Sequence, residues 1–304
     1  MTRGTKIALC TDTHFWPNGT NSIFSDGRIQ LQSATEELQE SLIATIWSHD
    51  PDIIIHLGDW SCGGGSFNMP DNAFYQALEQ AKEAFCGLDR PVYTLPGNHD
   101  CPPGGDYSFF AQLWNTESGV GHTIDLPEAR LVLINTHGHS ANQLAAAYPS
   151  DPISGWVNEA ELNRIEDALI TAENKPVIFF IHQLLMPWTA SYPWRDLYQV
   201  DNGEQVLNLM RLYGNVRAVF QGHAHMLDLS VHSVGQTDCT FVVTPAVIEY
   251  PIGWLMLELN EEGLTGQLQQ LPLPELAELS RQSGEGQEWR AGRPEWSNFR
   301  IELV

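Results

Sequence analysis

The 304-residue sequence predicts an α/β (α+β) fold in which two mixed β-sheets pack as a sandwich flanked by helices. Two observations support this prediction. Through residue 225, short apolar runs rich in β-branched residues alternate with segments whose apolar residues recur at helical spacing. Beyond residue 225, strand-like runs follow one another with only turn residues between them. Two sheets packed face to face, with helices outside, let every element bury its apolar side.

Apolar runs bounded by Gly, Pro or polar residues predict buried strands, since they are too short for helices. Five such runs lie in the first part of the chain, at residues 6–9, 52–57, 91–95, 176–181 and 216–220. Further strand-like runs span residues 123–125 and 131–135. After residue 225 the runs at residues 227–232, 240–244, 253–259 and 264–271 suggest an antiparallel meander or a second sheet.

Helical spacing marks four segments, at residues 33–47, 71–85, 158–171 and 203–213. Asp71 stands at a helix start, where its side chain is placed to cap the first turn, and Asn158 opens the third helix. We expect the apolar stripe of the first helix to face the core; it consists of Leu38, Leu42, Ile43, Ile46 and Trp47. The corresponding stripe of the third helix consists of Leu162, Ile165, Leu169 and Ile170.

The last part of the chain differs in composition, because residues from Pro272 on are rich in Pro, Gly, Glu and Arg. We therefore expect a main domain over residues 1–271 and a C-terminal extension over residues 272–304 that packs on it. Its last residues, 299–304, are expected to form an edge strand.

The net charge of −23 argues against a nucleic-acid polymer or an anionic membrane surface as a partner, since both attract basic patches. The simplest interpretation of this charge is solubility. An acidic surface also repels phosphate groups at long range. A phosphate-handling site here would need local cations, and metal ions can supply them.

Five cysteines without paired spacing predict neither a disulfide framework nor a zinc–thiolate site, and they favour a reducing compartment. The apolar stretch after Lys6 is too short for a signal peptide, and no run approaches the roughly 20 apolar residues of a membrane span. We therefore expect a cytoplasmic protein without a membrane segment.

Side chains that bind metal ions stand directly after the five buried strands. They are Asp12, His14, Asp59, Asn98, His182, His223 and His225. Because the carboxyl ends of parallel strands meet at one rim of a sheet, we expect these side chains to converge. Each alone is more simply a turn residue, a helix cap or a half-buried imidazole, but their joint placement favours a metal site.

The mixture of carboxylate, amide and imidazole ligands suits Mn, Fe, Zn or Co better than Mg or Ca. Seven ligands exceed what one ion holds comfortably, so the set predicts two metal ions, divalent or trivalent. Paired ions share bridging groups, and a carboxylate can offer one oxygen to each ion. On these grounds either Asp12 or Asp59 could bridge.

In chain order the motifs read Asp12-Thr13-His14, Gly58-Asp59, Gly97-Asn98-His99-Asp100, His182 and Gly222-His223-Ala224-His225. This series resembles the signature of the calcineurin-like metallophosphoesterase superfamily, D-x-H, G-D, G-N-H-[DE], H and G-H-x-H. The resemblance covers about residues 6–225. It implies the four-layer metallophosphoesterase fold, with residues 1–271 as the catalytic domain.

The resemblance also assigns a role to each residue of the set. It implies that the first metal is held by Asp12, His14 and His225, the second by Asn98, His182 and His223, and that Asp59 bridges them. His99 would be the non-ligand acid at the leaving oxygen, oriented by Asp100. The implied reaction is direct attack on phosphorus by a hydroxide that bridges the metals, without a covalent phosphoenzyme.

The leading hypothesis is therefore a dinuclear metal-dependent phosphoesterase acting on small phosphodiesters, nucleotides or phosphoanhydrides. A phosphomonoesterase of the same mechanism is the alternative. A non-catalytic scaffold is less favoured, because such relatives typically lose the acid histidine or a ligand, and this chain keeps them all. The ligand motifs are also similar to those of class III cyclic nucleotide phosphodiesterases. Residues 197–225 and 244–249 resemble Mn-dependent ADP-ribose/CDP-alcohol pyrophosphatases.

The loop after His182 is expected to overhang the metals and to contact the substrate. Trp188 and Trp194 could stack on a nucleobase, and Arg195 could hold a second phosphate. Alternatively, these rings pack the loop onto the body. His139, which forms an H-x-H pair after a predicted strand, is a further candidate substrate contact.

Overall fold

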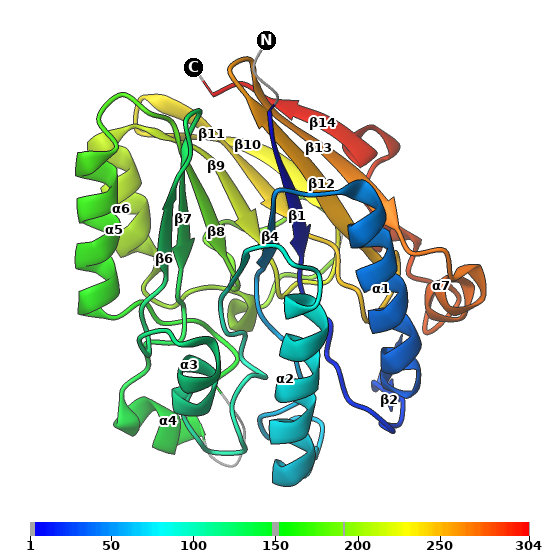
Figure 1. Ribbon diagram of the computed structural model, residues 1–304. Coiled ribbons are helices and arrows are strands. Elements are labelled where there is room, and N and C mark those ends of the chain that lie inside the picture. Colours follow the sequence, from blue (N-terminus) through cyan, green and yellow to red (C-terminus); the bar gives the residue numbers. More distant parts are fainter. Residues whose placement is uncertain (1–3, 148–151, 191, 304) are drawn as a thin grey trace.

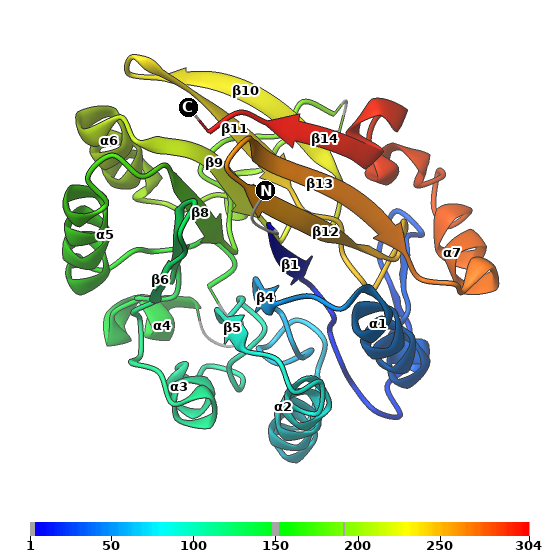
Figure 2. The ribbon, with the colours of Figure 1, turned by 45° about the horizontal axis from the view of Figure 1, so that its top comes forward.

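The computed structural model describes residues 4–147, 152–190 and 192–303. Within these residues, two six-stranded sheets lie face to face (Figures 1 and 2). The first sheet contains β1 (Thr5–Cys10), β4 (Ile53–His56), β5 (Val92–Thr94), β12 (Gly253–Asn260), β13 (Gly263–Gln270) and β14 (Asn298–Ile301), in the order β14-β13-β12-β1-β4-β5. The second contains β6 (His122–Asp125), β7 (Arg130–Ile134), β8 (Val177–Ile181), β9 (Val216–Gln221), β10 (Asp228–Val234) and β11 (Thr237–Val243), in the order β10-β11-β9-β8-β7-β6.

Both sheets are mixed, as predicted. In the first, β1, β4 and β5 run parallel, while β12, β13 and β14 are antiparallel to their neighbours. In the second, β7, β8, β9 and β11 run parallel, with β6 and β10 antiparallel at the two edges. The late strands therefore do not form a sheet of their own, because β10 and β11 extend one sheet and β12 to β14 extend the other. Local sequence could not separate these pairings, since strand partners are chosen by tertiary contacts.

Alternation along the strands builds the layers. On β1, Ile7 and Leu9 point between the sheets, whereas Ala8 and Cys10 face the helices on the outside. The outer face of the first sheet is covered by α1 (Thr35–His49) and α2 (Asp71–Cys86), and that of the second by α5 (Glu159–Thr171) and α6 (Gly203–Tyr213) (Figure 1). The four-layer arrangement of helix, sheet, sheet and helix is the one that the sequence predicts.

Several local predictions need correction. Trp47 and Ile170 are 59% and 53% exposed, so neither belongs to its buried stripe. On α1 the buried residues include Leu38, Leu42 and Ile46, which are spaced four residues apart, and Trp47 lies about 100° further round the helix. Asn158 stands at the start of α5, as predicted, and its side chain caps the helix by accepting the main-chain N–H of Glu161.

Asp71 does not cap its helix; it is the first helical residue of α2, and Pro70 stands at the capping position. Its charge lies in the first turn instead, where it is favourable to the helix dipole.

Three helices were not predicted, namely α3 (Ser108–Trp114), α4 (Ala141–Ala147) and α7 (Pro274–Arg281). α7 begins the C-terminal segment, and its Leu276 and Ala277 pack against the core beneath the first sheet. β14 ends the described part of this segment as the edge strand of that sheet, as expected. The division of the chain at residue 271 stays a prediction.

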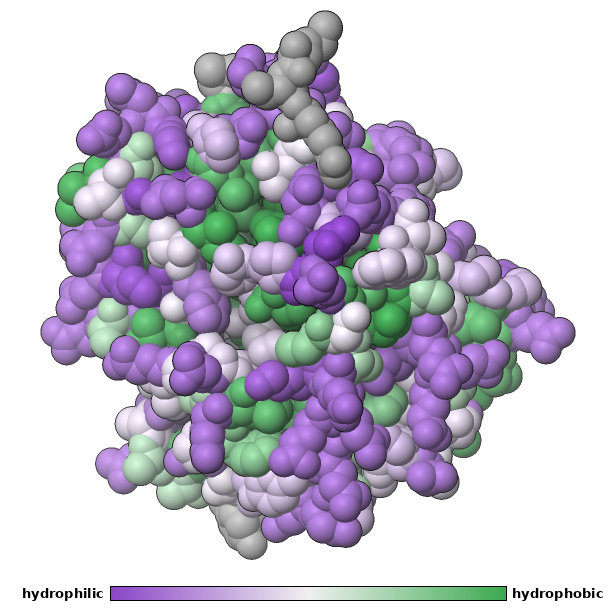
Figure 3. Space-filling view, in the orientation of Figure 1, coloured by the Kyte–Doolittle hydropathy of each residue, from purple (hydrophilic) through white to green (hydrophobic). Residues whose placement is uncertain are grey.

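The surface is consistent with the acidic composition, because the face in Figure 3 is mainly hydrophilic, with apolar side chains in separate small areas. In the described part of the chain, no helix combines the length and apolar character that crossing a bilayer requires.

Candidate metal centre

The carboxyl ends of five parallel strands meet at one end of the sandwich, and the predicted ligands lie in the loops that leave them. Asp12 and His14 follow β1, Asp59 follows β4, Asn98 follows β5, His182 follows β8, and His223 and His225 follow β9. These strands belong to both sheets, so the site lies across the gap between two sheets rather than on the rim of one. In Figure 1 the arrowheads of β1, β8 and β9 point towards this end, away from the two termini.

The structure brings six of the seven predicted ligands into two groups that share one carboxylate. In each group the potential donor atoms all lie within 4.8 Å of one another. The first group consists of Asp12, His14, Asp59 and His225, and the second of Asp59, His182 and His223. The seventh, Asn98, is buried in the turn after β5, next to His99, whose main-chain N–H donates to Asp59 Oδ1 at 2.8 Å. The position that the two groups share is suited to a bridging ligand.

The donor set fits cations. His14 Nε2 and His225 Nε2 face each other at 3.3 Å, and His225 Nε2 also lies 3.0 Å from Asp12 Oδ1. His182 is fully buried, its Nε2 is 3.3 Å from Asp59 Oδ2, and among the described residues its Nδ1 has no hydrogen-bond partner. Gathering so many buried lone pairs is unfavourable unless a cation or a proton lies between them. Imidazole nitrogens and carboxylate oxygens are what borderline transition metals prefer.

Burial and neighbouring charges shift the pKa values of these groups in different directions. Burial lowers the pKa of His14 and of His223 to about 3, which keeps both imidazoles neutral near pH 7, as metal ligation requires. Burial alone would raise the pKa of Asp59, but the neighbouring His182 and His99 lower it well below its usual value. Burial would lower the pKa of His225, yet the charge of Asp12 and the hydrogen bonds to Asp12 and Glu249 raise it to about 9.

The backbone conformation of the ligands is unusual. Five of them have a positive φ in the left-handed region, between 44° and 63°: Asp12, His14, Asp59, His223 and His225. This conformation turns the chain sharply in the loops after β1, β4 and β9. Non-glycine residues adopt it rarely, and Asp and His do so more readily than most others. Such strain typically collects at functional sites.

His99 lies at the edge of the first group. Its ring centroid is 5.2 Å from that of His14 and 4.7 Å from that of Phe67. Its Nδ1 is 3.1 Å from the carbonyl oxygen of Gly63. Because a carbonyl only accepts, this contact places a proton on Nδ1 and fixes the plane of the ring.

Asp100 connects the loops on either side of His99. Its carboxylate accepts main-chain N–H groups, at 2.9 to 3.2 Å, from Gly97, Trp60 and Ser61. These bonds tie the loop after β4 to the loop after β5, and so hold Asp59 beside Asn98. The orientation of His99 by Asp100 stays a prediction. Burial and the nearby Asp59 raise the pKa of Asp100 to about 7. The local motif could not reveal this role, because the amides come from a loop about 40 residues away.

A hollow of about 200 Å³ opens over the metal-binding groups. Its floor includes His14, Asp59, His99, His223 and His225, and its walls include Phe24, Arg28, Phe67, Tyr198, Glu249 and Arg290. The hollow therefore combines the potential ligands with aromatic and cationic side chains.

The residues predicted to contact substrate lie elsewhere. Among the described residues that line this hollow, neither Trp188, Trp194, Arg195 nor His139 occurs. Trp188 is buried against Trp194 and Tyr198, and its Nε1 donates to the carbonyl of Tyr192 at 3.1 Å. Trp188 also packs with Ala224, Met226 and Val243, which agrees with the alternative that the rings pack the loop onto the body. A contact of these residues with substrate stays a prediction.

Sequence reasoning missed Arg28, Glu249 and Arg290 as residues of the site. Arg28 follows a short hairpin turn between β1 and α1, and nothing in its local pattern distinguishes it. Arg290 lies in the segment that the sequence presents only as a Pro- and Gly-rich tail. The one usable signal was segment 244–249, which ends at Glu249 and carries one of the resemblances noted above.

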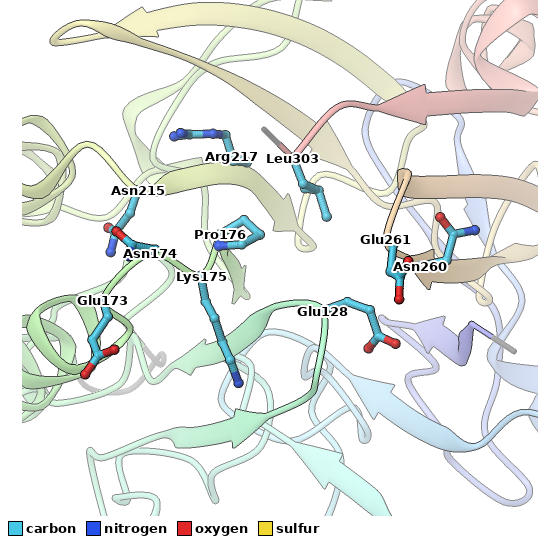
Figure 4. A pocket seen from close by; sticks show the side chains of 10 residues that line it. All are labelled: Glu128, Glu173, Asn174, Lys175, Pro176, Asn215, Arg217, Asn260, Glu261 and Leu303. Atoms are coloured by element: carbon cyan, nitrogen blue, oxygen red, sulfur yellow. The ribbon is translucent and has the colours of Figure 1, made fainter. Parts of the chain in front are cut away.

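A second hollow, of about 380 Å³, lies at the opposite end of the sandwich (Figure 4). Its lining includes Glu128, Lys175, Arg217, Glu261 and Leu303. Lys175 and Arg217 already donate to the carbonyls of Leu126 and Gly214. None of the residues lining this hollow is a histidine or a cysteine, so it does not compete with the first hollow as a metal centre.

A four-layer sandwich with two carboxylate–imidazole groups at the ends of its parallel strands has the architecture of a metallophosphoesterase. The model of the calcineurin-like phosphoesterase family matches residues 5–227. A probable cyclic nucleotide phosphodiesterase of Pseudoalteromonas sp. is 27% identical over 221 residues, which are 72% of this chain and 71% of the relative. The glycerophosphodiester phosphodiesterase GpdQ of Enterobacter lignolyticus is 24% identical, over 80% of this chain and 77% of its own.

Among solved structures, a dimetal phosphatase from Danio rerio superposes with a TM-score of 0.73 at 15% identity, covering 99% of this chain and 100% of that one. This likeness shows the shared fold. The chain belongs to the calcineurin-like phosphoesterase family, and it is a phosphoric ester hydrolase whose Asp and His groups fit metal ions.

Proposed function

We propose that the protein is a dinuclear metal-dependent phosphoesterase that hydrolyses small phosphodiesters, nucleotides or phosphoanhydrides directly, without a covalent phosphoenzyme. One observation carries the proposal: two metal-binding groups share Asp59 at the floor of a hollow that also holds His99. When bound, paired cations supply an activated water and withdraw charge from the phosphoryl oxygens.

The two groups support the ligand roles that the resemblance implies. Asp12, His14 and His225 would hold one ion, and His182 and His223 would hold the other with Asn98. Asp59 would contact both. The mixed nitrogen and oxygen donors support Mn, Fe, Zn or Co as the metals. Neither the family nor the net charge indicates the cellular compartment, so a cytoplasmic location stays a prediction.

His99 is the candidate general acid. It lines the hollow beside the first group, and the Gly63 carbonyl fixes its ring, so that a leaving oxygen bound there would meet the other ring nitrogen. General-acid assistance of this kind contributes about 10² to 10⁴ in rate. Its place outside both ligand groups supports a role in proton transfer rather than in metal binding.

The hollow supports a small substrate. Its volume of about 200 Å³ accommodates part of a nucleotide but not a folded phosphoprotein segment. Phe24, Phe67 and Tyr198 offer ring faces, and Arg28 offers a cation, on the walls. Named relatives act on cyclic nucleotides or glycerophosphodiesters, which agrees with a phosphodiester or anhydride substrate.

The test is a metal and substrate panel. Chelator-stripped protein would be reconstituted with Mn, Fe, Co, Zn or Mg and assayed with bis-p-nitrophenyl phosphate, p-nitrophenyl phosphate, a 3′,5′-cyclic nucleotide and ADP-ribose. We expect two ions per chain by elemental analysis, and cleavage that disappears in Asp59→Asn. In His99→Gln, activity should fall at least about 100-fold while both ions remain. Full activity without metal, or one ion per chain, would reject the proposal.

A further inference from the structure

Glu249 holds the ring of His225 from the side opposite the metal-binding groups. Glu249 is 1% exposed, and its Oε1 lies 2.6 Å from His225 Nδ1. The carboxylate accepts the proton of Nδ1, which leaves Nε2 facing Asp12 Oδ1 at 3.0 Å. A carboxylate behind a metal-binding histidine fixes the tautomer and raises the basicity of the ligand.

Arg290 holds both the carboxylate and the main chain of the same histidine. It is 2% exposed, and its Nη1 donates to the carbonyl of His225 at 2.7 Å and to that of Ala224 at 3.3 Å. The same nitrogen lies 3.4 Å from Glu249 Oε1. Its Nε donates to Gln287 Oε1 at 2.9 Å. The guanidinium thus has acceptors in the chain before β10 and in Gln287, the residue that precedes its own short helix, Glu288–Ala291.

These contacts answer a specific need of the backbone. His225 has a φ of 54°, a conformation that a non-glycine residue keeps only when its surroundings hold it. Arg290 binds the two carbonyls that flank this position, from 65 residues further along the chain. The main-chain N–H of Leu227 also donates to the carbonyl of Arg290 at 2.7 Å. The conformation of the loop is therefore set from the C-terminal segment.

Charge supports the same arrangement. Arg290 Nη1, 3.4 Å from Glu249 Oε1, places a cation beside the buried carboxylate. The same oxygen keeps its contact with His225 Nδ1, so Arg290 compensates the charge of Glu249 without taking it away from the imidazole.

We infer that Glu249 and Arg290 are positioning residues for His225, so that the C-terminal segment controls how tightly the ion of the first group is held. This inference rests on the proposed metal-dependent function. It assigns no contact with substrate to either residue. Its consequence is that a substitution at Glu249 or Arg290, both outside the family-matched residues 5–227, lowers the metal affinity of one group and leaves that of the other unchanged.

The experiment measures Mn²⁺ affinity, with Mn²⁺ alone as the probe. Glu249→Gln, Arg290→Met and Arg290→Lys would be titrated calorimetrically after metal removal, in the full chain. Arg293→Met is the matched control, since Arg293 lies in the same segment, is exposed, and packs over Trp296. We expect one of the two binding steps to weaken about 10- to 100-fold in Glu249→Gln and Arg290→Met. Arg290→Lys should recover part of the loss, and Arg293→Met should bind as the unaltered protein does.

Arg290→Met leaves Glu249 buried without its cation, so folding must be measured separately by circular dichroism and urea unfolding. Glu249→Gln is nearly isosteric and keeps the test decisive if Arg290→Met does not fold. Unaltered affinity at both sites in folded Glu249→Gln would overturn the inference, and so would equal weakening of both sites. If the unaltered protein binds two ions and cleaves diesters in that case, the proposed function still holds. If it does neither, the proposed function itself fails.

Discussion

Gly97→Ala tests whether Asp59 must stay where the structure places it. A Cβ at residue 97 would lie 2.2 Å from Asp59 Oδ1, 2.6 Å from its Cγ and 2.3 Å from its main-chain nitrogen. Normal contacts for such a carbon begin near 3.4 Å, so the carboxylate or the turn must move by about 1 Å. The carboxylate has little freedom to do so, because Oδ1 accepts the N–H of His99 at 2.8 Å.

The expected magnitude follows from this displacement. Forcing an extra carbon into packed surroundings costs about 1 to 3 kcal/mol of unfolding free energy. A misplacement of about 1 Å in a catalytic constellation costs about 10²-fold in rate. Because both metal-binding groups use Asp59, we expect Gly97→Ala to lower kcat/KM about 100-fold or more and to reduce the bound metal below two ions per chain.

The assay combines metal content, kcat/KM for bis-p-nitrophenyl phosphate and urea unfolding. Gly87→Ala is the control: Gly87 ends α2 with φ −63°, and its nearest Cβ neighbour would be 3.3 Å away. That change should leave activity intact and alter stability by no more than about 1 kcal/mol. If Gly97→Ala keeps two ions and at least a third of the activity, the close approach to Asp59 does not limit the site, and the reasoning fails.

Three further predictions follow from other contacts. Because Arg28 lines the hollow, Arg28→Gln should raise KM for a nucleoside diphosphate sugar. The increase should be about 10-fold, which corresponds to the loss of one charged hydrogen bond. The control Arg195→Gln changes an exposed arginine outside the hollow and should change KM less than twofold. Glu161→Ala should cost about 3 to 5 kcal/mol in urea unfolding, since it removes a buried carboxylate that binds Arg164 and two main-chain amides. Ellman's reagent should modify one thiol of the native protein, that of the exposed Cys86, and five after unfolding; rapid reaction of a second native thiol would contradict the structure.

The ligands were predictable because their positions depend on local sequence. Each follows a short apolar run, and such runs become buried strands whose ends meet at one end of the sandwich. His182 illustrates this well: the five preceding residues are all fully buried in β8, and the histidine is the first residue beyond the strand. The longer helices α1, α2, α5 and α6 were predictable for the same reason, apart from residues such as Trp47 at the edge of a stripe, whereas the short α3, α4 and α7 were not.

The walls of the site were not predictable, because they are set by contacts between distant segments. Arg195 lies in the loop that follows a ligand yet does not line the hollow, while Arg28 and Arg290 line it from segments with no local sign of a role. Asp100 shows the same limit within a motif. Besides Gly97 of its own motif, its carboxylate accepts two amides of another loop. The type of a residue determines which interactions its side chain can make. Only the tertiary structure determines which atoms the side chain contacts.

The left-handed conformation links the position of a ligand in its loop to its residue type. A strand delivers side chains alternately to its two faces, and neither face points along the strand axis towards the cations. Left-handed residues in the loops after β1, β4 and β9 redirect the chain, and five predicted ligands adopt this conformation. The cost is of order 1 kcal/mol for each, smallest for Asp and His, which are also the residue types that bind these metals. Moving such a ligand one residue along its loop would place a different residue type in the left-handed position and turn the ligand out of its group. The metal-binding chemistry and the backbone geometry therefore select the same residues at the same positions.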